Sequence, residues 1–423
     1  MGVARTLGER SRHVADKSVP RDIAVFIDGT WNEGRAGAPT NVLKLYEATR
    51  SGRIDGRVQV KLYIPGVGRK PASLGEGLRD EEYQALLALQ LRHELPAALS
   101  RARAAIGGVF GKGTTARIKA AYQAICDEFV RERGDRVFVF GFSRGAFAAR
   151  SLSGFMERVG LLLREHTGKV ERAYELYESG QDASQSELAN YLHELTGQTI
   201  RGIDDDFWLP VHFLGVWDTV ASLGLPSRLR CLSAPFTEYH QVDVPPNVMH
   251  ARHGLALHEL RSPFEPLLWR PGTHASLEQV WFPGAHSDVG GGYPEGETGL
   301  SDEALMWMAA EAENKGLALD RSSYWLHPVA CPPSIHLAAR GLFTEVMPRP
   351  RAWLESGTAD ARDTFHFHSS ARDYLCSSLA PAYDFRQWWV NSALRKVDDL
   401  AAARMVLSRL NGNRIVQTLE HSA

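Results

Sequence analysis

Three polar side chains in this sequence could together activate a hydroxyl group for attack on an ester: Ser143, Asp218 and His286. A serine hydroxyl is a poor nucleophile at its own pKa, and a histidine titrates in the range that suits the base which takes its proton. A carboxylate bonded to the second ring nitrogen then fixes the imidazole tautomer and stabilises the imidazolium. These residue types therefore predict acyl transfer by a catalytic triad.

The serine lies in a pattern typical of a sharp, exposed turn. Residues 141–145 read G-x-S-x-G, after a short apolar run at 137–140 and before small and apolar residues at helical spacing over 146–156. Strand, turn and helix in this order are the context of a nucleophile elbow. The backbone N–H of Arg144 would then lie at a helix N-terminus and could stabilise an oxyanion. The alternative is an ordinary glycine-rich turn in which Ser143 caps the helix.

The other two members of the set also follow apolar runs, each of which predicts a buried strand. Asp218 comes after residues 211–217, and His286 lies in the loop after residues 277–282. Because the C-terminal ends of parallel strands meet at one sheet edge, we expect these side chains to lie together. Serine, aspartate and histidine also occur in the chain order of α/β-hydrolases. The sequence thus predicts an α/β fold with a mostly parallel sheet flanked by helices.

Other roles remain open for these residues and their neighbours. Asp218 could be a helix N-cap, and His286 could be a hydrogen-bonded loop residue. His366 and His368 are alternative bases, although they follow no convincing strand. Asp288 could accept a hydrogen bond behind the site or cap a helix.

The first predicted strand, residues 23–27, ends in a turn that would lie at the same sheet edge. The backbone N–H groups of Gly29 and Thr30 are the best candidates for a second oxyanion donor. Asp28 is expected to support the site from behind. An aspartyl phosphohydrolase centred on Asp28 is the weaker alternative. Haloacid-dehalogenase-type phosphatases need the pattern D-x-D-G-T, and this chain has only one of its two aspartates.

Two further segments resemble ligand sites only superficially. The glycine-rich residues 107–113 lack the first glycine and the Ser or Thr of a phosphate loop, so they are better explained as the lead-in to a helix over 115–132. Residues 248–260 predict a helix with three histidines, whose spacing does not give the ligand set of a zinc site. The expected chemistry requires neither a metal nor an organic cofactor. The three histidines of the segment 248–260 are His250, His253 and His258.

Capping signals and two insertions complete the expected organisation. Thr40 and Ser301 are expected to cap helices over residues 41–49 and 303–312. Residues 69–106 and 158–208 are predicted as helical insertions; the second is a natural cap over a site, with surface decoration as the alternative. The predicted divisions are an N-terminal tail at 1–21, a catalytic domain at 22–320 and a C-terminal extension at 321–423 packed on the same domain.

Composition excludes several classes of protein. Of the 423 residues, 44% are hydrophobic and 23% are charged, as in ordinary globular proteins, and the net charge of −2 argues against a nucleic-acid binder. The four cysteines are scattered, which favours neither a disulfide framework nor a zinc site. A secretory signal and a transmembrane helix are not expected, so we predict a location in the cytoplasm of the producing cell.

Together these segments resemble a family of α/β-hydrolase domains, long uncharacterised in bacteria and fungi, whose best-known members are phospholipase effectors of bacterial type VI secretion. The 69–106 insertion has no counterpart in that pattern, and the C-terminal hundred residues match only faintly around residues 368–370. The matching segments, in family order over residues 22–310, are 26–32, 66–68, 141–146, 215–220, 259–261 with Phe264, 283–293 and 299–305.

The resemblance implies both an activity and a set of partners. The catalytic serine, aspartate and histidine of the family fall on Ser143, Asp218 and His286. It implies a serine esterase that acts on acyl esters, with phospholipids as the expected substrates and with peripheral membrane contact. Export by type VI secretion and an immunity or secretion partner protein follow from the same likeness. The alternative is a non-catalytic binding or interaction protein on the same fold.

Overall fold

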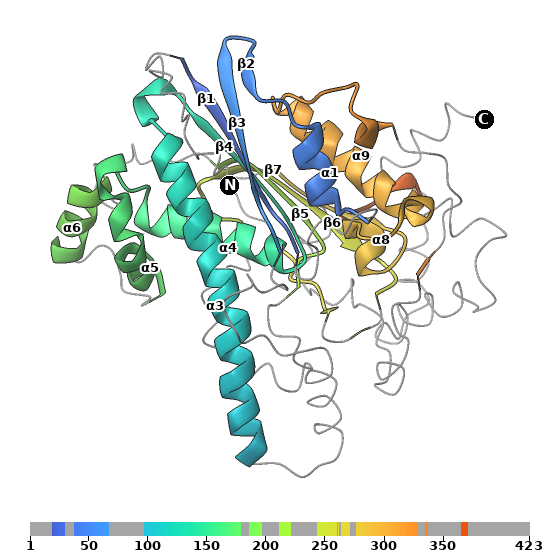
Figure 1. Ribbon diagram of the computed structural model, residues 1–423, viewed down its shortest axis with the longest axis horizontal. Coiled ribbons are helices and arrows are strands. Elements are labelled where there is room, and N and C mark those ends of the chain that lie inside the picture. The colour runs from blue at the N-terminus through green and yellow to red at the C-terminus, as the bar shows by residue number, and fades with distance from the viewer. Residues whose placement is uncertain are drawn as a thin grey trace, which may run out of the picture.

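The centre of the molecule is an eight-stranded, mostly parallel sheet (Figure 1). The strand order is β2-β3-β1-β4-β5-β6-β7-β8, and among these described strands only the β2–β3 pair is antiparallel. The strands are β1 (Arg21–Ile27), β2 (Gly52–Ile54), β3 (Arg57–Ile64), β4 (Arg136–Phe142), β5 (Val211–Trp217), β6 (Val248–Ala256), β7 (Ser276–Phe282) and β8 (Phe365–Phe367). This computed structural model describes residues 19–29, 38–66, 97–178, 186–196, 211–220, 243–259, 261, 264–270, 276–327, 335–336 and 365–370.

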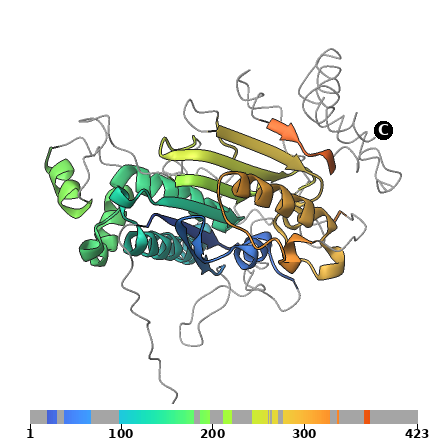
Figure 2. The same cartoon turned by 90° about the horizontal axis from the view of Figure 1, so that it is seen from above.

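Helices cover both faces of this sheet, so the predicted fold class is confirmed (Figure 2). Because successive side chains of a strand point to opposite faces, β1 places Val25 and Ile27 in one core and Ala24 and Phe26 in the other. Burial on both faces explains why the strands read as continuous apolar runs. The first core lies under α3 (Ala97–Glu128), α4 (Arg144–Val159) and α5 (Val170–Glu178), and the second under α1 (Asn41–Ala48) and α9 (Gly299–Asn314).

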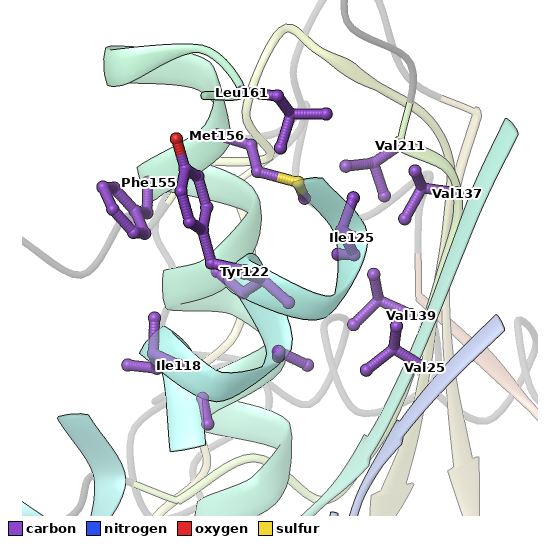
Figure 3. Packing of buried hydrophobic residues seen from close by; sticks show 14 of the residues in the cluster. Val25, Ile118, Tyr122, Ile125, Val137, Val139, Phe155, Met156, Leu161 and Val211 are labelled. Carbon is purple, nitrogen blue, oxygen red and sulfur yellow. The ribbon is translucent and has the colours of Figure 1, made fainter. Parts of the chain in front are cut away.

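The packing of α3 and α4 holds the helix that follows Ser143 in place (Figure 3). The rings of Tyr122 on α3 and Phe155 on α4 stack with centroids 4.0 Å apart. The Tyr122 hydroxyl donates to the carbonyl of Gly160 at 2.8 Å, which ties α3 to the end of α4. Ile125 of α3 belongs to the same buried cluster. Aromatic pairs of this kind contribute about 0.5–1.5 kcal/mol beyond their burial.

Several predicted elements are confirmed with small changes at their ends. The strand over residues 211–217 is β5, and Thr40 caps α1 by accepting the Leu43 N–H at 3.2 Å. The predicted helix over 303–312 is longer, because α9 begins at Gly299 and its N-cap residue is Thr298. Ser301 lies inside α9, where its hydroxyl donates to the Thr298 carbonyl at 2.9 Å. The expectation that Ser301 caps this helix was wrong.

The predicted helix over residues 248–260 was also wrong, because residues 248–256 form strand β6. β6 pairs in parallel with β5 on one side and β7 on the other. It contains buried Arg252 and His253, which interrupt the apolar pattern of a central strand. Both make tertiary contacts: Arg252 Nε donates to Glu311 at 2.6 Å, and His253 Nε2 accepts the Thr219 N–H at 3.1 Å.

The glycine-rich segment at 107–113 was predicted as a lead-in, but it lies within α3. Glycine in a helix interior costs about 1 kcal/mol relative to alanine, so local propensity alone places the helix start too late. The C-terminal part of α3 is nevertheless buried, through Ile118, Tyr122 and Ile125. Of the predicted 69–106 insertion, residues 97–106 are the start of α3, and residues 69–96 lie outside the described residues.

The described part of the segment 158–208 flanks the sheet and does not cover the end of β4. It contains α5 and α6 (Ser186–Thr196), and α5 packs against α4 through Tyr174 and Tyr177 on Phe155. Phe155 is far along α4 from Ser143, which immediately precedes this helix. In its described residues, this segment therefore matches the alternative of a surface position and not the predicted cap.

β8 is the edge strand of the sheet on the side opposite β2; it pairs in parallel with β7 and contains His366. The expectation that no strand precedes His368 was therefore wrong, since a strand of three residues is too short for a clear periodic signal. Most of the predicted extension at 321–423 lies outside the described residues. None of the helices searched among the described residues has the length and apolarity needed to cross a membrane.

Candidate active site

Ser143 occupies a strained turn between β4 and α4. Its backbone has φ 58° and ψ −119°, a conformation that residues with a side chain rarely adopt. The two glycines of the G-x-S-x-G pattern make this turn possible: a Cβ atom on Gly141 would lie 2.4 Å from the carbonyl oxygen of Gly145. The Ser143 N–H donates to the Trp217 carbonyl at 3.0 Å. The turn is thus tied to the end of β5, where the predicted aspartate follows.

Asp218 directly follows β5 and is completely buried. Its backbone also has a positive φ, 39°, and its N–H donates to the carbonyl of Gly254 on β6 at 2.7 Å. One carboxylate oxygen, Oδ1, accepts the Ala256 N–H at 2.9 Å. The backbone of β6 therefore fixes the carboxylate and leaves Oδ2 directed at another partner. The alternative role of Asp218 as a helix N-cap finds no support, because Thr219 and Val220, which follow it, are not helical.

His286 is that partner, and it also reaches the serine. It begins the short helix α8 (His286–Gly290) after β7. Its Nδ1 lies 2.5 Å from Asp218 Oδ2, and its Nε2 lies 2.8 Å from Ser143 Oγ. All three side chains are buried, and Ser143 has the largest exposed fraction, 8%. The structure thus brings together the three residues that the sequence selected, in a continuous chain of hydrogen bonds.

Two aromatic rings and burial define the surroundings of the imidazole. The ring centroids of Phe142 and Phe264 lie 4.6 Å and 4.9 Å from that of His286. Removal of water disfavours the imidazolium, so burial lowers the pKa of His286, and the hydrogen bond and charge of Asp218 partly offset this effect. A neutral imidazole is the form that can take a proton from Ser143.

The turn after β1 lies beside the elbow but differs in detail from the prediction. The Gly29 N–H donates to the carboxylate of its own neighbour, Asp28, at 2.6 Å, so in this structure that donor is already used. Thr30 lies outside the described residues. Arg144 is the first residue of α4, as the sequence predicts for the other oxyanion donor. The backbone N–H of Arg144 therefore remains the better supported of the predicted donors.

Asp28 is a buried structural carboxylate with both oxygens engaged. Besides Gly29, it accepts hydrogen bonds from the hydroxyl groups of Thr40 at 2.7 Å and Tyr63 at 2.6 Å. Burial raises the pKa of Asp28 to about 6, and these hydrogen bonds act in the opposite direction. A carboxylate held in this way joins β1, α1 and β3, and it does not suit a phosphoryl-transfer nucleophile.

Asp288 lies just after His286 and forms a second histidine pair. It accepts from the Ala285 N–H at 2.8 Å, and its Oδ1 lies 2.5 Å from Nδ1 of His336. His336 Nε2 lies 3.0 Å from Glu297, and the His336 ring stacks on Tyr293 with centroids 3.7 Å apart. Asp288 therefore holds the start of α8 through the backbone N–H of the N-cap residue Ala285, and its predicted support of the site stays a prediction. Its partner His336 was not singled out from the sequence.

Comparison with known proteins gives the family. The sequence profile of the catalytic domain of Tle1-like phospholipase effectors of the type VI secretion system (T6SS) matches residues 21–311, which include the elbow, Asp218 and His286. The chain belongs to this family. The matched range also contains every described strand except β8.

Individual relatives share less of their length with this chain. An uncharacterized protein of Saccharomyces cerevisiae is 32% identical over 267 residues, which are 63% of this chain and 35% of the relative. A crystal structure of an uncharacterized protein from Pseudomonas aeruginosa has a TM-score of 0.39 at 20% identity and covers 74% of this chain and 48% of its own. The structure of the Tle1 effector bound to the VgrG spike has a TM-score of 0.33 at 19% identity, with coverages of 67% and 53%. The chain thus spans about half the length of these structures or less, and the fold assignment rests on the sheet itself.

The sequence analysis named residues 259–261 of this Tle1-like domain only as part of the family pattern, and His258 only as a poor zinc ligand; it assigned them no role beside His286. Glu259 is buried and bonded to Arg261, and its Oε2 accepts the His286 backbone N–H at 3.2 Å. His258 accepts the Gly284 N–H at 2.7 Å, at the turn that leads to His286. A Glu and an Arg two residues apart directly after a buried strand were the available signal, since buried charges are normally paired.

The three histidines predicted on one helix do not form a cluster for metal. His250, His253 and His258 lie in or directly after β6, where neighbouring side chains of a strand alternate between faces. Over the described ranges, no group of three or more His, Cys, Asp and Glu side chains is arranged to hold a metal ion.

Proposed function

We propose that this chain is a serine esterase that hydrolyses carboxylic esters, with phospholipids as its substrate class. The observation that carries the proposal is the hydrogen-bonded chain from Ser143 Oγ through His286 to Asp218. Three features support it further: the strained backbone of Ser143, the lowered pKa of His286 and membership of a phospholipase effector family. A binding protein would need none of the first two features.

In the proposed reaction, His286 Nε2 takes the hydroxyl proton as Ser143 Oγ attacks the ester carbonyl carbon. The oxyanion that forms is stabilised by the Arg144 N–H at the start of α4. Collapse of this intermediate breaks the bond to the alcohol, which leaves with the proton from His286. A water molecule then attacks the acyl-enzyme by the same route and releases the fatty acid. With a phospholipid, the alcohol that leaves is a lysophospholipid.

The wider biological setting is part of the same proposal. Membership of an effector family supports export by type VI secretion from the cytoplasm of the producing cell, with an immunity or secretion protein as partner. A lipid substrate requires contact with a membrane surface. We assign residues 22–320, which contain strands β2 to β7 and nearly all of β1, to one catalytic domain, with residues 321–423 as an extension that adds β8 to the same sheet.

Covalent labelling with a fluorophosphonate probe tests the proposed nucleophile. We expect stoichiometric labelling of wild type on Ser143, located by peptide mass mapping, and none in Ser143→Ala. His286→Ala should label far more slowly, whereas His212→Ala is the matched control. His212 lies at the start of β5, where its Nε2 is 2.8 Å from the Lys315 carbonyl. Absence of labelling in folded wild-type protein would overturn the serine mechanism.

Phospholipid vesicles then test the substrate class. Incubation of wild type with vesicles should release fatty acid and lysophospholipid in equal amounts, measured by mass spectrometry, and Ser143→Ala should release neither. Labelling on Ser143 with hydrolysis of soluble esters alone would keep the serine esterase and exclude the phospholipid assignment.

A further inference from the structure

The segment that follows β6 contacts His286 through a buried ion pair. The Glu259 side chain is fully buried, and Arg261 is 17% exposed. Glu259 Oε1 accepts from Arg261 Nε at 2.8 Å and Oε2 accepts from Nη2 at 2.7 Å, so the pair is bidentate. The Arg261 backbone N–H also donates to Oε1, at 2.8 Å. Pairs of this geometry are strong and directional.

The same carboxylate also holds the backbone of the histidine. Glu259 Oε2 accepts the His286 N–H at 3.2 Å. This N–H belongs to the first turn of α8, where no carbonyl within the helix can accept it. Glu259 therefore fixes the position at which the His286 side chain leaves the main chain.

Arg261 acts on the opposite part of the residue, the imidazole ring. The Arg261 guanidinium lies over the Phe264 ring at 3.6 Å, and the Phe264 and His286 rings meet in a T-shaped contact with centroids 4.9 Å apart. Phe142 lies against the imidazole as well, at 4.6 Å. The guanidinium thus holds Phe264 in contact with the ring while it is itself held by Glu259.

We propose that Glu259 and Arg261 are positioning residues for His286, which hold its backbone and its ring at the distances that join Ser143 to Asp218. This inference rests on the proposed function. A pair that only stabilised the core would have no reason to bond the His286 main chain through Glu259 and to hold, through Arg261, the Phe264 ring that touches the imidazole. A substrate-binding arginine would be expected to present its guanidinium to solvent, whereas the Arg261 group is bonded to a buried carboxylate on two of its nitrogens.

The charges that surround His286 make the role measurable. Asp218 and Glu259 are the acidic groups and Arg261 is the basic group that act on it; the acids raise its pKa and the arginine lowers it. Glu259→Gln removes one acid and leaves the arginine, so the pKa of His286 should fall. Arg261→Lys keeps the charge but cannot make the bidentate pair and the flat contact with Phe264.

The test is the rate of fluorophosphonate labelling per folded molecule, measured against pH, with kcat and KM for a soluble ester. Both variants should label about 10- to 100-fold more slowly than wild type, since misplacing a catalytic group by about 1 Å can cost this much. KM should change little. The acidic limb of the profile should move to lower pH in Glu259→Gln and stay in place in Arg261→Lys.

Asp22→Asn is the matched control. Asp22 is a buried carboxylate in a bidentate pair with Arg136. Both residues lie at the N-terminal ends of β1 and β4, whereas Ser143 follows the C-terminal end of β4. Asp22→Asn should lower the melting temperature and leave the labelling rate of folded protein unchanged. If Glu259→Gln does not fold, Arg261→Lys carries the test.

Three results would overturn the inference. Labelling rates equal to wild type in both variants would reduce the pair to a stabilising contact. A raised KM with unchanged labelling by the small probe would make it a substrate-binding pair. An acidic limb that stays in place in Glu259→Gln would show that Glu259 does not act on His286. Failure of the proposed function is distinguishable, because wild type itself would then not be labelled.

Discussion

A Cβ atom on Gly145 would lie 2.1 Å from the carbonyl oxygen of Ile27, so the turn after Ser143 passes the end of β1 with no room for a side chain. Gly141 is equally confined within the turn itself. These contacts are the reason for both glycines of the G-x-S-x-G pattern. The tight turn holds Ser143 in its strained conformation beside His286.

Gly145→Ala should therefore displace the start of α4 or the end of β1. Overpacking of this kind typically costs about 1–3 kcal/mol, and the backbone on both sides leaves little freedom to relax. The free energy of unfolding, measured with denaturant, and the rate of fluorophosphonate labelling of Ser143 should both fall. Gly168→Ala is the control, since a Cβ there would have nothing within 4 Å. Equal stability and reactivity of the two variants would contradict this account of the elbow.

Asp218→Asn should remove most of the activity without removing the fold. The asparagine oxygen can still accept the Ala256 N–H, but its amide would then face His286 Nδ1 and favour the wrong tautomer. The analogous change in a serine protease lowers kcat by about 10⁴-fold. Initial rates of ester hydrolysis provide the measurement, with circular dichroism as a check on folding. Asp243→Asn, which breaks an exposed pair with Arg270, should have no effect. Activity within a factor of about ten of wild type would argue against this role for Asp218.

The esterase activity should persist to lower pH than an ordinary histidine would allow. His286 must be neutral to act as a base, and burial lowers its pKa below the usual 6.5. The acidic limb of kcat/KM, which reports the free enzyme, should therefore have its midpoint below that value. A neutral ester substrate keeps the titration of the substrate out of the profile. A midpoint above 6.5 would mean that the Asp218 charge outweighs burial.

His258 should make the fold less stable as the pH falls. Burial lowers the pKa of His258 from 6.5 to about 3. Between these two pH values His258 is protonated in the unfolded chain and neutral in the folded chain. The contribution of neutral His258 to the free energy of unfolding is fully present above pH 6.5, the pKa in the unfolded chain. As the pH falls from 6.5 to about 3, the pKa in the folded chain, this contribution is lost at about 1.4 kcal/mol per pH unit. The raised pKa of Asp28 has the opposite effect on the pH dependence of stability, and this effect is the same in wild type and in a variant that lacks His258.

The contribution of His258 can be isolated by comparison with His258→Gln. The glutamine oxygen can still accept the Gly284 N–H, but the side chain does not titrate. Denaturant unfolding at several acidic pH values should show a smaller loss of stability in the variant than in wild type. Parallel pH dependences would mean that His258 is accessible to protons in the folded state.

The centre of the sheet could be predicted from the sequence because the strands β1, β4 and β5 are buried on both faces. Such strands appear as short apolar runs, and the residue after each run lies at the shared edge. This reasoning selected Ser143, Asp218 and His286. It failed for β6, where Arg252 and His253 are buried only because Glu311 and the Thr219 backbone satisfy them.

The sequence by itself determined the fold class, the elbow and the three residues at the strand ends, because apolar periodicity and turn chemistry are local properties of the chain. Tertiary structure alone decided that Gly29 bonds to Asp28, that Asp288 pairs with His336 and that Glu259 holds His286. The last two contacts join segments far apart in the sequence. All three hydrogen bonds contribute to the structure only because their groups are shielded from water. Local patterns do not encode which polar groups will be buried together, and that choice sets the pKa of His286 and its distance from Ser143.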